Sequence, residues 1–141
     1  MWIIAGLVLA GVLLRAVVAF GVFGRMPLVS DAESYAAEAT DWLAHGHPRA
    51  FYWPPGNTVL LLLSFGALGE GAFAARVATV LVSSLTVVFA AGIGGRLGGR
   101  RVAFATAATG ALYVPAVLLC GQSYSQHLAG LCLVAVAYYG P

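Results

Sequence analysis

Long apolar runs alternate with short polar stretches along the chain, and this alternation predicts a set of membrane-crossing helices. The runs at 2–23, 73–93 and 102–119 are each close to the ~20 residues that a helix needs to cross a bilayer. A fourth run, at 126–139, is shorter, and we expect it to be a partial span. The pattern predicts an all-α polytopic membrane protein with three full spans and a partial fourth.

The stretch 24–71 separates the first two runs and carries most of the polar residues, so we expect it to fold as a loop outside the apolar layer. Ser30 with Glu33 three positions later is the pattern of a capping box, which begins a helix. The helix should continue to about Ala44, because Gly46 follows and glycine commonly ends helices.

This predicted helix is amphipathic. Its apolar residues at helical spacing should lie on the membrane surface or the protein body, and they are Tyr35, Ala39, Trp42 and Leu43. Its acidic residues beyond the first turn, Glu38 and Asp41, are expected on a solvated face.

Aromatic residues and prolines follow this helix. The aromatic cluster 51–53 suits the membrane–water boundary, although it could also stack on a sugar. Pro54, Pro55 and Gly56 predict a rigid turn that does not continue a helix. The apolar run 58–68, at about eleven residues, is too short to cross a membrane and predicts an interfacial or re-entrant helix.

Composition supports a membrane protein and excludes several classes. The chain is 61% hydrophobic and only 9% charged, whereas a soluble domain has about 25% charged residues. The net charge of +2 is too small and too scattered for nucleic-acid binding. We interpret the two cysteines, Cys120 and Cys132, as small apolar residues and not as a disulfide or metal site.

The arginines predict the orientation. The turn 94–101 carries Arg96, Arg100 and Arg101 without any acid, so the positive-inside rule places it in the cytoplasm. The loop 24–71 is then outside and the N-terminus is cytoplasmic. Because no basic leader precedes the first apolar run, we expect it to remain as an uncleaved helix.

Two arginines fall within or beside the apolar runs. Arg15 interrupts the first run, where a charge is costly, so it should snorkel, pair with a neighbouring helix or hold a lipid phosphate. Arg76 opens the second run, either as an interfacial anchor or as a ligand for a phosphate.

The motifs and their order resemble the N-terminal part of polytopic glycosyltransferases of the C superfamily, in particular protein mannosyltransferases and aminoarabinose lipid A transferases (family 39-like). The stretches that carry this resemblance are 31–35, 52–56, 74–76, 94–103 and 111–115. The resemblance covers nearly all of this chain but only about the first third of such an enzyme.

The resemblance implies transfer of a sugar from a polyprenyl-phosphate donor to a lipid, protein or glycan acceptor on the outer side of a membrane, here a bacterial plasma membrane. Asp31 and Glu33 stand where the family has its acidic motif. Ala32 departs from the adjacent acid pair of mannosyltransferases, and Gln126 stands where many relatives carry a further acid. The need for a divalent metal is left open.

Roles for the remaining candidate residues follow from the same chemistry. Asp31 is the candidate general base, with Glu33 beside it, although both are also ordinary acids for a helix N-terminus. The departing phosphate requires donors, and the candidates are Arg76, Arg49 and His47. The other residues assigned to substrate binding are Tyr35, Tyr52, Pro54 and Pro55, the prolines as a hinge.

Two functions from other classes compete with the enzyme. One is a small non-catalytic membrane subunit or assembly module with the same fold. The other is part of a transporter, but transporters carry ionisable residues near mid-span in several helices, and only Arg15 qualifies here.

Overall fold

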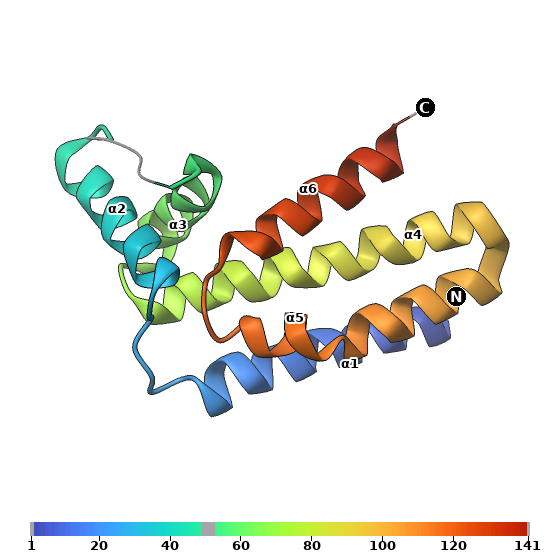
Figure 1. Cartoon of the computed structure of the whole chain (residues 1–141). Coiled ribbons are helices and arrows are strands. Elements are labelled where there is room, and N and C mark those ends of the chain that lie inside the picture. Colours follow the sequence, from blue (N-terminus) through green and yellow to red (C-terminus); the bar gives the residue numbers. More distant parts are fainter. Residues whose placement is uncertain (1, 49–52, 141) are drawn as a thin grey trace.

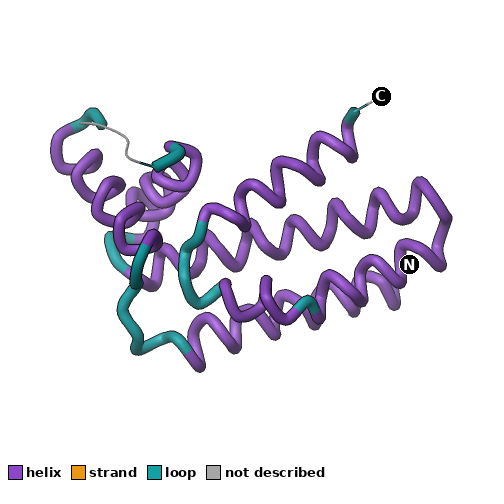
Figure 2. The backbone as a smooth tube through the Cα atoms, viewed as in Figure 1, coloured by secondary structure: helices purple, strands orange, loops and turns teal. Residues whose placement is uncertain are grey.

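The computed structural model describes residues 2–48 and 53–140, and every regular element in these ranges is a helix (Figures 1 and 2), which confirms the predicted all-α class. The elements in chain order are α1 (Trp2–Ala16), the π-helical extension η1 (Val17–Val22), α2 (Asp31–His45), α3 (Pro55–Leu68), α4 (Ala72–Leu112), α5 (Val114–Leu119) and α6 (Ser125–Tyr139).

The helix α4 is a hairpin of two helical limbs that lie side by side (Figure 1). The reversal occurs at Gly98 and at Gly99, whose φ of 67° and ψ of −162° are accessible almost only to glycine. A Cβ atom on Gly94 would lie 2.6 Å from Thr106 Oγ1, so the limbs approach closely where side chains are absent. The chain therefore reverses within the predicted turn 94–101, but only Gly98 and Gly99 leave the helical conformation.

Two helices of the described residues are long and apolar enough to cross a membrane, Trp2–Val22 and Ala72–Leu112. The runs predicted at 73–93 and 102–119 fall on the two limbs of the second, and the later run continues into α5 after a break at Tyr113. The 15 residues of α6 are fewer than the ~20 that a crossing needs.

The helix α1 packs along the α4 hairpin with one face and exposes the other. Gly11 is buried, and a Cβ atom on it would lie 2.9 Å from the Cβ atom of Ala111. Leu9, Leu13 and Val17 are more than half exposed, which suits a face in contact with lipid.

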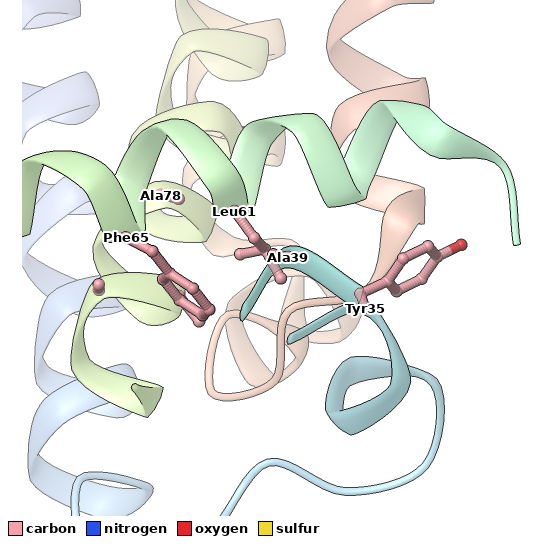
Figure 3. Packing of buried hydrophobic residues seen from close by; sticks show 7 residues of the cluster. Tyr35, Ala39, Leu61, Phe65 and Ala78 are labelled. Carbon is pink, nitrogen blue, oxygen red and sulfur yellow. The ribbon is translucent and has the colours of Figure 1, made fainter. Parts of the chain in front are cut away.

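A second core joins α2 to α3 and to the start of α4 (Figure 3). Ala39 of α2 lies against Leu61 of α3, and Phe65 follows one turn later on the same helix. The buried line of α2 consists of Ala32, Tyr35 and Ala39, whereas Leu43, predicted on the apolar face, is 38% exposed. The buried part of this face therefore ends at Ala39, earlier than predicted.

The start of α3 differs from the prediction. The prolines were expected to form a rigid turn, but Pro54 is the N-cap and Pro55 is the first helical residue, so the helix begins three residues before Thr58. Proline suits this position because the first N–H of a helix has no partner within the helix. Gly56 is then the second residue of α3, and the predicted hinge at 54–56 is wrong.

Candidate functional site

The acidic helix and the arginine-rich turn lie at opposite ends of the bundle (Figure 1). At one end are α2, α3 and the turn between α5 and α6; at the other is the Gly98–Gly99 reversal, which Arg96, Arg100 and Arg101 surround. The N-terminal turn of α1 lies at the arginine end, since Ile3 lines a pocket together with Arg100 and Arg101.

Arg76 holds the acidic end together. It is 2% exposed, and its guanidinium donates to the carbonyls of Gly121 (3.0 Å from Nε), Gly24 (3.4 Å from Nη1) and Met26. These carbonyls belong to two separate segments, 23–30 and 120–124, so Arg76 cross-links them. Arg76 therefore has a structural role at this end, and we leave it out of the proposed phosphate site.

Gln122 strengthens the same link. Its Oε1 accepts from the Val29 N–H (3.1 Å), and its Nε2 donates to the Pro27 carbonyl (3.3 Å). The chain segment that leads into Asp31 is thus held by the side chains of both Arg76 and Gln122. Sequence reasoning missed Gln122, and its only signal was its place in the short polar stretch 122–126.

Asn57 and Thr79 complete this polar layer. Asn57 Nδ2 donates to the Ser123 carbonyl (2.9 Å), and Thr79 Oγ1 donates to Ser123 Oγ (3.0 Å). All three residues are buried, so α3 and α4 are both attached to the turn that Arg76 binds.

Asp31 begins α2 directly after a strained residue. Ser30 has φ 58° and ψ −133° and is the only non-glycine residue with positive φ among the described residues. Its side chain does not cap the helix but donates to Asp31 Oδ1 (3.3 Å), so the predicted capping box is wrong. Asp31 is half-buried, and the first N–H groups of α2 stabilise its negative charge.

The second acid at this site is Glu38. It accepts a hydrogen bond of 2.8 Å from Thr58 Oγ1, a fully buried hydroxyl of α3, so the prediction of a solvated side chain is wrong for Glu38. Seven residues are close to two helical turns, so Asp31 and Glu38 share one face, roughly 10 Å apart along the axis. Glu33 is exposed and lies on the other side of α2.

Tyr35 lies between these two acids on α2. It is 2% exposed, its ring packs against that of Trp53 with centroids 6.2 Å apart, and its hydroxyl points away from Leu61 and Phe65 (Figure 3). The ring therefore belongs to the core, and only the hydroxyl end is directed toward the rim of the α2–α3 pair.

His45, His47 and the remaining candidates are peripheral. His45 Nδ1 lies 3.2 Å from Asp41 Oδ1, and His47 is exposed, with its Nδ1 3.4 Å from the Pro48 carbonyl. Within the described ranges no three His, Cys, Asp or Glu side chains are grouped to hold a metal. The predicted substrate ligands Arg49 and Tyr52 lie outside the described residues.

Comparisons of this chain with protein-family models, with curated protein sequences and with solved structures find no match. Its function is therefore argued from its own motifs and geometry.

Proposed function

We propose that this chain is the N-terminal part of an integral membrane glycosyltransferase. The enzyme transfers a sugar from a polyprenyl-phosphate donor to a lipid, protein or glycan acceptor at the outer face of a bacterial plasma membrane. The observation that carries the proposal is the position of Asp31. This half-buried acid begins an amphipathic helix at the end of the apolar bundle opposite to the exposed arginines.

Three full crossings and a partial fourth fit the helix lengths. The first limb of α4, residues 72–97, extends about 39 Å at ~1.5 Å per residue, more than the ~30 Å of a hydrocarbon core. The second limb with α5 reaches Leu119, and α1 with η1 supplies the remaining crossing. The 15-residue α6 is the partial span.

The orientation follows from the charges at the two ends. Arg96, Arg100 and Arg101 are exposed at the hairpin reversal, so that end is cytoplasmic under the positive-inside rule. The start of α1 is then cytoplasmic too, and α2 faces outward, where it meets a lipid-linked donor.

The reaction needs one base and one leaving-group site. The Asp31 carboxylate takes the acceptor hydroxyl proton as the acceptor oxygen attacks the anomeric carbon. The bond from that carbon to the phosphate oxygen breaks with inversion, and the polyprenyl phosphate leaves with the electron pair. A base in this position contributes roughly 10²–10⁴-fold. Glu38 takes the place of Glu33 as the second acid, because it shares the face of Asp31.

Substitution of Asp31 tests this function. In the full-length enzyme, Asp31→Asn should lower the rate of sugar transfer by ~10²–10⁴-fold, because the amide cannot accept the proton. The assay follows radiolabelled sugar from polyprenyl-phosphate mannose or polyprenyl-phosphate aminoarabinose. The matched control is Asp41→Asn on the same helix, which should retain activity. Transfer by Asp31→Asn at the wild-type rate would remove Asp31 from the mechanism, and no transfer by the wild type from either donor would refute the proposal.

A further inference from the structure

A cavity of about 440 Å³ lies within the bundle, away from the acidic helix. The first limb of α4 forms its floor with Ser83 and Thr86, and its walls are the second limb, α5 and α6. Figure 1 shows α6 on one side of the first limb, with the second limb and α1 on the other. Arg15 of α1 and His127 of α6 reach this space from opposite walls.

Arg15 brings a positive charge into the cavity lining. It is 1% exposed, and its Nε donates to Ser83 Oγ (2.9 Å). Its Nη1 donates to the carbonyls of Gly11 (3.1 Å) and Ala111 (3.2 Å), and its Nη2 to that of Gly110 (2.8 Å). Arginine has five N–H donors, so these four bonds leave one N–H of Nη2 without an assigned acceptor.

Every one of these acceptors is neutral. The five carboxylates of the chain all lie between 31 and 70, and none forms a salt bridge with Arg15 in the described part of the chain. A charge in an apolar interior is costly unless an opposite charge accompanies it. The prediction that Arg15 pairs with a neighbouring helix is confirmed for hydrogen bonding, but the charge itself has no counterion there.

His127 Nε2 is a second polar atom without a partner in the described part of the chain. The residue is 8% exposed, and its Nε2 has no hydrogen-bond partner among the described residues. Buried polar atoms nearly always have one. Arg15 and His127 both line this cavity, so a ligand bound there lies beside both side chains.

We propose that this cavity binds the head group of a phosphate monoester lipid. An anionic oxygen accepts from Arg15 Nη2, and the P–OH of the singly protonated phosphate donates to His127 Nε2. A phosphate diester has an anionic oxygen but no P–OH, so it satisfies only Arg15. Free phosphate shares the head-group chemistry, but the lining of Val87, Pro115 and Leu119 offers apolar surface for an attached chain. This site does not depend on sugar transfer.

Lipid selectivity of the full-length protein tests the site. The protein in phosphatidylcholine nanodiscs receives spin-labelled phosphatidic acid, phosphatidylglycerol or phosphatidylcholine, and electron paramagnetic resonance measures the immobilised fraction. Phosphatidic acid should associate about fivefold more strongly than phosphatidylcholine, the effect expected for one arginine. The association of phosphatidylglycerol should be intermediate in strength. The His127→Phe variant should bind phosphatidic acid no more strongly than phosphatidylglycerol, while both should still associate more strongly than phosphatidylcholine.

Two glycines provide a matched pair of variants that leave Arg15 and its helix contacts intact. Gly130 lines the cavity, and a Cβ atom there meets nothing within 4 Å, so Gly130→Leu should occupy the site and remove the selectivity. Gly66 of α3 is equally open but lies outside the cavity lining, so Gly66→Leu should leave the selectivity unchanged.

Three results would overturn the proposal. Equal association of all three lipids would exclude a head-group site. Selectivity that survives Gly130→Leu would place the preference at the protein surface. Displacement of phosphatidic acid by millimolar inorganic phosphate would assign the site to free phosphate instead of a lipid.

Discussion

The two arginines that are buried among the described residues use main-chain carbonyls as their principal partners. Arg15 joins α1 to the second limb of α4 through Gly110 and Ala111, and Arg76 joins the segments 23–30 and 120–124. A guanidinium suits this task because its planar fork presents five donors to carbonyls from different segments. These carbonyls lie where helices end or break, so they lack acceptor bonds within a helix.

The first prediction concerns Arg76. Its replacement by Met should lower the free energy of unfolding by about 2–4 kcal/mol, because three carbonyls lose a charged donor in a buried layer. Arg76→Lys should lower the free energy of unfolding by less, since an ammonium keeps the charge but cannot reach all three oxygens. Unfolding in mixed micelles, followed by tryptophan fluorescence, measures the change. Arg100→Gln, on an exposed side chain, should stay within about 0.5 kcal/mol of the wild type. An Arg76→Met variant as stable as the wild type would contradict the structural role.

For single residues, the sequence indicates which polar side chains matter but not which groups they contact. Asp31 was singled out because acids are rare here, and the structure does place it at the edge of a packed helix pair. Arg76 was expected either as an interfacial anchor or at a phosphate, yet its bonds run to carbonyls 45 to 52 residues away in the chain. Glu38 was expected in solvent, yet it accepts from Thr58 on another helix. Contacts between distant segments depend on tertiary packing, which local spacing does not encode.

The positions of the helices in this chain follow from the apolar runs and their spacing. The first residue of each helix depends instead on the backbone conformation of the loop before it. The runs at 2–23 and 58–68 and the helix expected to end near Ala44 all correspond to helices of the structure. The end at Gly46 is also as expected, since its φ of 74° and its N–H bond to the Trp42 carbonyl close α2. The start at Pro55 and the uncapped Ser30 were not foreseen, because each depends on how the preceding loop is held.

The reversal of α4 gives a prediction about an element. Gly99→Ala should destabilise the protein by about 1–3 kcal/mol, because a Cβ atom is strained at φ 67° and ψ −162°. Gly6→Ala in the middle of α1 should do the opposite and stabilise by roughly 0.5–1 kcal/mol, because Gly6 is helical and open on its exposed side. Micelle unfolding of both variants tests the pair, and a Gly99→Ala variant that unfolds no earlier than the wild type would contradict the glycine-specific turn.

Taken as a whole, the molecule keeps its acids at one end and has a cluster of arginines without acids at the other. All five acids belong to the 31–70 stretch at one end, while Arg96, Arg100 and Arg101 lie around the reversal at the other. Arg96 also lies over the ring of Tyr138, 3.8 Å from its centroid, so the end of α6 is tied to the arginine end. For a bundle that crosses a bilayer, the positive-inside rule favours the arrangement in which this arginine cluster is cytoplasmic.

This arrangement predicts which residues a membrane-impermeant maleimide reaches in intact cells. In a background with Cys120→Ala and Cys132→Ala, a cysteine in place of Glu33 should react from outside, because Glu33 is exposed on α2. A cysteine in place of Leu97, which is 82% exposed beside the reversal, should react only after the cells are opened. Helix lengths permit this difference, because residues 72–97 are long enough to separate the two sites by a full hydrocarbon core. Reaction of both cysteines from the same side would show that the bundle does not cross the membrane as proposed, and Asp31 could not then act on a donor at the outer face.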